Sequence, residues 1–278
     1  MDPPPLTLLS WNLQLLSPQA QLRKSRAVAI GGRILGLSPR PQVVCLQEVW
    51  CPKARALLCS VLGQAYPHTF CPASSHKCGL LIASLHPLSN CTFLQFEGSM
   101  GMEKRVFQKG AAGCLVNLAG GERVSVINTH LESDFWKSGQ PARCLQVNEL
   151  AQFVRRMALD AECSDGAPIR GTLLAGDLNI VAGSKECEIA MALLGGLVDS
   201  EFDCAEDAAG KSTAGPPTFP LGIWKRGKKA YLLRTPSCRL DYVLQSKEMA
   251  GGRVKVDVQL AMADGAPLSD HAPLILTA

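Results

Sequence analysis

Several features that would assign the chain to a specialised class are missing from its 278 residues. None of the 12 cysteines forms the C-x-x-C spacing of a structural zinc site. The opening segment MDPPPLTLLS lacks the basic and long apolar regions of a secretory signal. No apolar run is long enough to cross a bilayer. Charged residues make up 19% and hydrophobic residues 47%, a composition that excludes a disordered chain. We therefore expect a globular, soluble, cytoplasmic protein without a transmembrane segment.

The cysteines that are present are scattered, and some, such as Cys45 and Cys114, lie inside apolar runs. This pattern is typical of small buried side chains in a reducing compartment, because a chain of this length does not need disulfides to be stable. The net charge of +4 permits an anionic partner without requiring one. Composition therefore leaves the function open.

Short apolar runs alternate with stretches of helical periodicity along the chain. The expected strands are Leu6–Leu9, Val43–Leu46, Gly79–Ala83, Gly113–Leu118, Val124–Asn128, Thr172–Ala175, Leu240–Leu244 and Leu274–Leu276. The expected helices are Pro18–Leu35, Pro52–Leu62, Ala142–Ala161 and Lys185–Leu194. Because strands dominate and no linker interrupts them, we expect one domain spanning residues 1–278, of α/β class, with two packed sheets flanked by helices.

Three segments carry more detailed expectations. In the helix Ala142–Ala161, one face is predicted to be apolar; it comprises Leu145, Leu150, Phe153, Val154 and Met157. The small, polar, glycine-rich segment Ala205–Pro217 predicts a loop. The segment Trp224–Lys229 (WKRGKK) predicts a basic turn.

Polar residues recur where the apolar runs end, although a buried strand rarely ends in an acid, amide or imidazole without a reason. Asn12 offers an oxygen to a cation and an amide to a phosphate, or it caps a turn. Glu48 follows the run Val43–Leu46, where a carboxylate is costly unless it joins an ion pair or binds a metal such as Mg²⁺. His130 closes a further run; it can donate to a phosphate, or be a hydrogen-bonded core residue.

The motif Gly176-Asp177-Leu178-Asn179 follows another apolar run. Asp177 and Asn179 are two residues apart, so in an extended segment they point the same way. An acid and an amide on one face can activate and orient a water molecule. The alternative interpretation is an Asx turn.

The last two motifs lie in the C-terminal part of the chain. Asp241 is embedded in an otherwise apolar run, and Asp270 precedes His271. A buried aspartate that fixes the tautomer of a histidine makes a competent general base near neutral pH. Each motif has an alternative explanation by itself, but their joint occurrence favours a metal-dependent phosphoesterase.

With these residues together, the sequence resembles the endonuclease/exonuclease/phosphatase superfamily, which shares the deoxyribonuclease I fold. The resemblance rests on six motifs in the family's order: Trp11-Asn12, Leu46-Gln47-Glu48, Thr129-His130-Leu131, Gly176-Asp177-Leu178-Asn179, Arg239-Leu240-Asp241-Tyr242 and Ser269-Asp270-His271. It implies a four-layer α/β sandwich with the site where the strand ends of the two sheets meet.

The resemblance also implies roles for these residues. Mg²⁺, with Mn²⁺ as a substitute, would be held chiefly by Glu48, with Asn12 and Asp270 nearby. Water would attack a phosphodiester or phosphomonoester in line, and the implied catalytic set is His130, Asp177, Asn179, Asp241 and His271. The superfamily leaves the identity of the general base open.

Two branches of the superfamily resemble this chain most. The neutral sphingomyelinases have a Lys-Gly-initiated strand, a Thr-His-Leu strand and an Arg-x-x-Gln helix, similar here to Lys109-Gly110, Thr129-His130-Leu131 and Arg143–Gln146. The tyrosyl-DNA phosphodiesterases share the character of His130-Leu131-Glu132-Ser133. Between Asp241 and Asp270 the chain has no tryptophan or phenylalanine, unlike the membrane-contacting hairpin of bacterial sphingomyelinases.

These features lead to three functional hypotheses. The first is a sphingomyelinase-like phospholipase C that acts on a phospholipid headgroup, with peripheral membrane contact. The second is a nuclease or tyrosyl-DNA phosphodiesterase, for which the basic clusters would bind nucleic acid. The third is a scaffold without activity, which the complete set of eight polar residues argues against.

Overall fold

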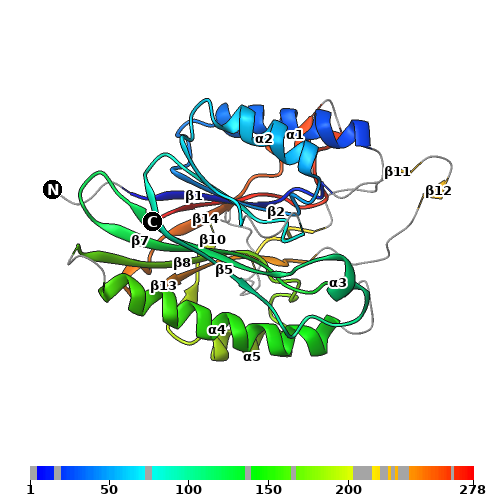
Figure 1. Ribbon diagram of the computed structural model, residues 1–278. Helices are drawn as coiled ribbons and strands as arrows, with labels where there is room; N and C mark the ends of the chain where they lie inside the picture. Colours follow the sequence, from blue (N-terminus) through cyan, green and yellow to red (C-terminus); the bar gives the residue numbers. More distant parts are fainter. Residues whose placement is uncertain are drawn as a thin grey trace, which may run out of the picture.

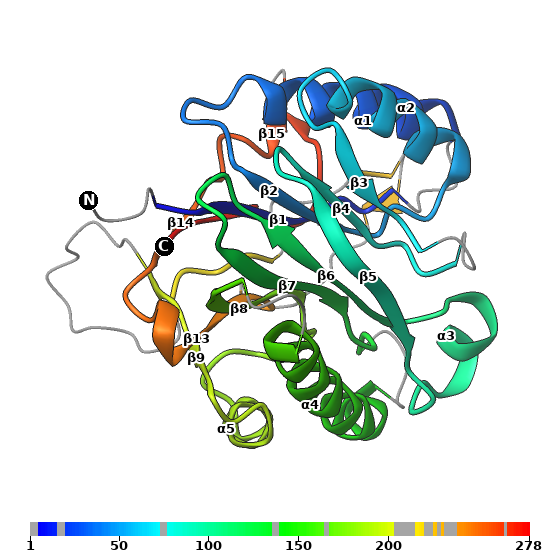
Figure 2. The ribbon, with the colours of Figure 1, turned by 60° about the vertical axis from the view of Figure 1, so that its left-hand side comes forward.

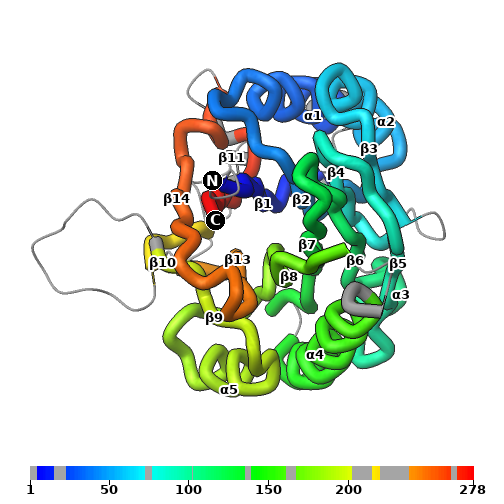
Figure 3. Tube along the Cα trace, turned by 90° about the vertical axis from the view of Figure 1, so that its left-hand side faces the viewer, coloured from blue at the N-terminus to red at the C-terminus, as the bar shows by residue number. Residues whose placement is uncertain are grey.

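Two stacked β-sheets with helices on both outer faces form the molecule (Figures 1 and 3). The computed structural model describes residues 5–15, 20–72, 77–134, 139–163, 167–202, 215–219, 225–226, 229–230, 238–263 and 266–278. This arrangement confirms the expected four-layer α/β sandwich. Trp224 and most of the segment 205–217 lie outside the described residues.

The first sheet has the strand order β10-β14-β17-β1-β2-β4-β3. Its strands are β1 (Thr7–Asn12), β2 (Val43–Gln47), β3 (His68–Phe70), β4 (Leu81–Ser84), β10 (Glu201–Phe202), β14 (Arg253–Val256) and β17 (Leu274–Thr277). Helices α1 (Ala20–Leu35) and α2 (Pro52–Leu62) cover its outer face, at the top of Figure 1. The first strand of the chain therefore pairs with the last, antiparallel, and with β2, parallel.

The second sheet has the order β5-β6-β7-β8-β13-β9. Its strands are β5 (Leu88–Gln95), β6 (Gly110–Asn117), β7 (Arg123–His130), β8 (Ile169–Asp177), β9 (Leu197–Asp199) and β13 (Asp241–Ser246). Helices α4 (Gly139–Cys163) and α5 (Lys185–Leu193) cover its outer face, as Figure 2 shows from a second side. The smaller elements are α3 (Gly101–Val106), the 3-10 turn Lys247–Met249, and two hairpins, β11 (Lys225–Arg226) with β12 (Lys229–Ala230) and β15 (Met262–Ala263) with β16 (Ala266–Pro267).

Strand alternation divides the apolar residues among three cores. In β1, Leu8 packs between the two sheets, whereas Leu9 and Trp11 pack against α1 and α2. A third core lies between the second sheet and the helices α4 and α5, and includes Phe153. Strands buried on both faces explain why the apolar runs of the sequence are nearly continuous.

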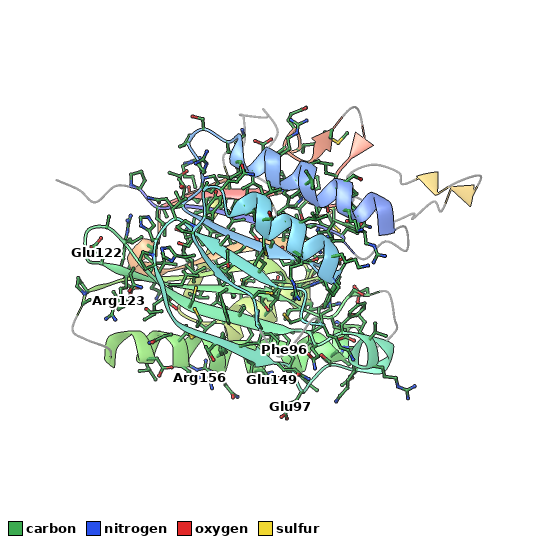
Figure 4. All side chains as sticks on the ribbon, turned by 45° about the horizontal axis from the view of Figure 1, so that its top comes forward. Phe96, Glu97, Glu122, Arg123, Glu149 and Arg156 are labelled. Atoms are coloured by element: carbon green, nitrogen blue, oxygen red, sulfur yellow. The ribbon has the colours of Figure 1, made fainter. Side chains whose placement is uncertain are left out.

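Helix α4 corrects one expectation. Leu145 was expected on the buried face, but its side chain is 46% exposed. The position is taken by Gln146 and Val147, which are buried. Nearby, the carboxylate of Glu149 accepts hydrogen bonds from the backbone N–H groups of Glu97 and Gly98. Glu149 and Glu97 lie side by side in Figure 4. The helix is therefore rotated so that polar side chains fasten the segment after β5.

For the described residues, the structure bears on two expectations: that the cysteines are not in disulfides and that no segment spans a membrane. Ten cysteines within the described residues are free thiols. Among the helices that the structure describes, none combines the length and apolarity needed to cross a bilayer.

Candidate active site

The ends of four strands and the start of a fifth bring the polar residues of the sequence motifs together. Asn12 ends β1 and Glu48 follows β2, and these two strands are parallel neighbours. In the second sheet, His130 at the end of β7 pairs with Asp177 at the end of β8, and Asp241 at the start of β13 pairs with the same Asp177. Because the sheets are stacked, both sets of ends lie at one end of the sandwich.

Asn12 joins the two sheets at this point. Its Nδ2 donates to Asp177 Oδ2 over 2.9 Å and lies 3.3 Å from Glu48 Oε1. Its Oδ1 accepts from the backbone N–H of Gln14. The amide thus orients two carboxylates, and all of these contacts lie in or at the edge of the buried interior.

The segment after β8 has a tight, specific geometry. Gly176 has φ +147, and a Cβ at this position would lie 2.0 Å from the carbonyl oxygen of Thr129. Asn179 has φ +53; its N–H donates to Asp177 Oδ1 over 2.8 Å, and its Nδ2 donates to the Leu131 carbonyl. The expectation of an extended segment is therefore wrong. An Asx turn is present, and the Asn179 amide group fastens the end of β7.

His271 is held by Asp241. The ring Nδ1 donates to Asp241 Oδ2 over 2.8 Å, which leaves Nε2 at 3.7 Å from Asp177 Oδ2. The ring of Phe219 packs against the imidazole with 4.8 Å between centroids. This is the carboxylate–histidine arrangement that the sequence predicts.

His130 has a partner that the sequence interpretation did not include in the site. Lys109 Nζ lies 2.8 Å from His130 Nε2, 2.9 Å from the Leu131 carbonyl and 3.5 Å from Glu103 Oε2 in α3. The Lys109 side chain is only 3% exposed. The Lys-Gly motif was the signal for this residue, because a lysine directly before a buried strand requires partners.

The carboxyl groups of the site repel one another. Burial raises the pKa of Glu48 above its ordinary value and raises the pKa of Asp177 and Asp270 to about 6. The Oδ1 atom of Asp241 is buried and has no hydrogen-bond partner among the described residues. Grouped carboxylates of this kind fit a divalent cation, because oxygen ligands suit Mg²⁺ and its charge would offset the repulsion.

The geometry offers two sets of metal ligands. Ligand atoms of Asp177, Asp241 and His271 all lie within 4.8 Å of one another. The expected set is Asn12, Glu48 and Asp270. Within it, the Glu48 and Asp270 side chains keep 21% and 14% of their surface exposed, so their oxygens remain accessible from solvent. His271 Nδ1 is bonded to Asp241, so the first set would have to use His271 Nε2. The proposed set remains Asn12, Glu48 and Asp270, in which Asn12 orients Glu48 because its own Oδ1 accepts from the Gln14 N–H.

The surroundings shift the pKa values of His130 and His271 in opposite directions. Burial and the adjacent Lys109 ammonium hold the pKa of His130 well below its ordinary value. Burial also disfavours the charged form of His271, but Asp241 and Asp177 outweigh burial and raise its pKa well above the ordinary value. The surroundings therefore favour the neutral form of His130 and the cationic form of His271.

Comparison with known proteins gives the family. A sequence profile of the Endonuclease/Exonuclease/phosphatase family matches residues 9–271. No curated protein matches the chain in sequence. Among solved structures, sphingomyelinase C from Streptomyces griseocarneus is 23% identical with a TM-score of 0.72, over 99% of this chain and 100% of that one. A mutant beta toxin from Staphylococcus aureus with bound magnesium ions is 19% identical with a TM-score of 0.72, over 99% of each chain.

A third similar structure comes from another branch. Truncated TDP2 from Caenorhabditis elegans is 20% identical with a TM-score of 0.69, over 98% of this chain and 97% of that one. At these identities the structures report the fold, which they share with this chain. The family profile spans nearly the whole chain and includes every strand end that contributes to the site. The chain therefore belongs to the endonuclease/exonuclease/phosphatase family, a family of metal-dependent phosphoric ester hydrolases.

Proposed function

We propose that the chain is a Mg²⁺-dependent phosphodiesterase of the neutral sphingomyelinase type, which hydrolyses sphingomyelin or a related phospholipid to a lipid alcohol and a phosphorylated headgroup. One observation supports this branch above the others. The motifs that resemble the neutral sphingomyelinases converge on the two residues after His130: Lys109 Nζ donates to the Leu131 carbonyl, Arg143 Nη1 donates to the Glu132 carbonyl, and Gln146 Oε1 accepts from the Glu132 N–H. They act as one unit that supports His130.

The proposed roles follow from the contacts of each side chain. When bound, Mg²⁺ supplies positive charge at the phosphate and a template for it; Glu48 and Asp270 would hold it, with Asn12 orienting Glu48. Asp177, an acceptor whose Oδ2 lies 3.7 Å from His271 Nε2, would receive the proton of the attacking water.

The remaining groups act on charge and position. Lys109 and His130 would stabilise the charge that develops on the phosphate oxygens. Asp241 fixes the tautomer of His271. Asn179 keeps the end of β7 beside Asp177 through the Leu131 carbonyl.

A substrate panel with Mg²⁺ tests the proposal. It contains sphingomyelin in detergent micelles, nicked and abasic duplex DNA, a 5′-tyrosyl oligonucleotide and inositol phosphates. We expect release of the phosphorylated headgroup from sphingomyelin, and its loss with EDTA. Cleavage of the oligonucleotides without any lipid hydrolysis would refute the sphingomyelinase assignment.

The alternative is a nuclease or tyrosyl-DNA phosphodiesterase. The similarity in fold to TDP2 and the exposed Lys104 and Arg105 of α3, in the segment just before Lys109, favour it. When a protein neutralises DNA phosphates, the logarithm of its binding constant falls linearly with the logarithm of the salt concentration. The slope is roughly −0.9 per contacted phosphate. A steep slope on duplex DNA would support the alternative, whereas activity on neutral lipid micelles should depend little on salt.

We also propose that residues 1–278 form one domain and that the protein acts in the cytoplasm, touching membranes peripherally. The free thiols among the described cysteines support a reducing compartment. Fractionation of cells that express a tagged chain tests this location.

A further inference from the structure

The first and last motifs of the sequence meet in a seam beside the proposed metal ligands. Trp11 Nε1 donates to the His271 carbonyl over 2.9 Å, and Ser269 Oγ donates to the Asn12 carbonyl over 2.6 Å. Gln14 Nε2 donates to Asp270 Oδ2 over 2.6 Å. The position of Asp270 therefore depends on how the segment after β1 is held against the segment before β17.

Arg26 of α1 contacts both sides of this seam. Its Nε donates to the Leu268 carbonyl over 2.6 Å, its Nη2 to the Leu13 carbonyl over 2.6 Å, and its Nη1 to the Gln14 carbonyl over 2.9 Å. The residue is 8% exposed. A planar guanidinium with five donors can bridge carbonyls of two segments, whereas the single ammonium of lysine cannot reproduce this geometry.

Gln14 connects the Arg26 contacts to the carboxylate of Asp270. Its φ is +46, a left-handed conformation that is unfavourable for a residue other than glycine and persists only when the surroundings impose it. Arg26 Nη1 binds the carbonyl of this residue, and the side chain of the same residue binds Asp270. The chain of contacts thus runs from a buried cation, through a constrained backbone, to a proposed metal ligand.

We propose that Arg26 is a positioning residue that sets the affinity of the metal site, by holding Gln14 and the segment before Asp270 in one arrangement. The inference rests on the metal-dependent function proposed above. It concerns a residue on a helix outside the six motifs, and one that touches none of the reacting atoms. Residues that orient metal ligands typically contribute a factor of about 10 to 100 in metal affinity.

Calorimetric titration with Mn²⁺ alone, without substrate, tests this role in the full chain. We expect Arg26→Lys and Arg26→Gln to raise the dissociation constant for Mn²⁺ by at least about tenfold. Arg33→Lys and Arg33→Gln are the matched controls, because Arg33 is an exposed arginine of the same helix, and they should bind Mn²⁺ as the wild type does.

Thermal unfolding of the metal-free variants separates positioning from support of the fold. If Arg26→Lys lowers the melting temperature but binds Mn²⁺ with unchanged affinity, Arg26 is only structural and the inference is wrong. If Arg26→Gln does not fold, Arg26→Lys decides, since it retains the charge but not the bridge. A Gln14→Leu change combined with Arg26→Lys should weaken Mn²⁺ binding by less than the sum of the two single effects, because both interrupt one chain of contacts; full additivity would contradict the inference.

Metal binding by the wild type separates failure of the proposed function from failure of the inference about Arg26. If wild-type protein binds neither Mn²⁺ nor Mg²⁺, the proposed metal-dependent function fails, and the inference about Arg26 fails with it. Normal binding by the wild type together with normal binding by Arg26→Lys overturns the inference alone.

Discussion

At the scale of single residues, the two site histidines have opposite environments. Asp241 binds His271 and raises its pKa, whereas burial and Lys109 lower the pKa of His130. Two copies of one residue type can therefore serve different steps of a hydrolysis. Sequence reasoning identified both histidines, but it could not assign their charge, because Lys109 reaches His130 only through the pairing of β6 with β7.

Substituting His271 should remove activity without removing the fold. We expect His271→Ala to lose turnover on every substrate of the panel, because the group that faces Asp177 is gone. Circular dichroism should show the wild-type content of secondary structure. His68→Ala in β3, a partly buried histidine away from the site, is the control and should retain activity. Wild-type turnover in His271→Ala would refute the assignment of the site.

Of the ten cysteines whose side chains the structure describes, Cys91 in β5 should be the fastest to react near neutral pH. Its side chain is exposed, and a hydrogen bond with the buried Cys114 of the neighbouring strand lowers its pKa to about 7. Because the thiolate is the reactive form, alkylation by iodoacetamide should become fast as the pH rises through about 7. Peptide mass spectrometry after brief treatment at pH 7 should find Cys91 modified before the exposed Cys144. Equal labelling of both would contradict the prediction.

At the scale of elements, strands with continuous apolar runs were predictable and irregular ones were not. The run Val43–Leu46 differs from β2 by one residue, and Pro52–Leu62 is the observed α2. By contrast β5 has no apolar run, because it lies at the edge of the second sheet and is half-exposed along its length. Helix α3 is short and is held by the ion pair of Glu103 with Lys109, a residue outside the helix, which helical periodicity does not encode.

The junction after β8 makes a testable prediction about Gly176. The Gly176→Ala change should destabilise the protein by about 1–3 kcal/mol or more, because φ +147 is strained for alanine and its Cβ would meet the Thr129 carbonyl. Urea unfolding measures the loss. Gly120→Ala, in the turn before β7 where a Cβ meets nothing within 4 Å, is the control and should leave the midpoint nearly unchanged. Comparable stability of the two variants would mean that the junction is less rigid than described.

At the scale of the whole molecule, the site is an interface between the two sheets. Asn12 and Glu48 come from the first sheet, whereas Asp177 and Asp241 come from the second. The motif order of the sequence predicted this convergence through the family resemblance. The direct contacts across it, such as Asn12 with Asp177, follow from the stacking of the sheets and could not be derived from any one motif.

A bound divalent cation should therefore stabilise the whole fold. At a Mg²⁺ or Mn²⁺ concentration 100 times the dissociation constant, the free energy of unfolding should rise by about 2.7 kcal/mol, since only the folded state presents the ligands. Thermal unfolding after EDTA treatment and after metal addition measures the difference. Glu48→Gln should abolish most of the shift while keeping the bond from Asn12, and Glu122→Gln in the turn between β6 and β7 should not. An unchanged shift in Glu48→Gln would exclude Glu48 as a ligand.

The pairing of β1 with β17 has a consequence for synthesis on the ribosome. The N–H of Leu6 donates to the carbonyl of Ala278, and β1 pairs antiparallel with β17, the strand that follows Asp270 and His271. In a nascent polypeptide, β1, the central strand of the first sheet, therefore has no antiparallel partner at first. It gains this partner only when β17 has been synthesised and has left the ribosomal exit tunnel. Because Asp270 and His271 directly precede β17, the site is also incomplete as long as this segment remains in the tunnel.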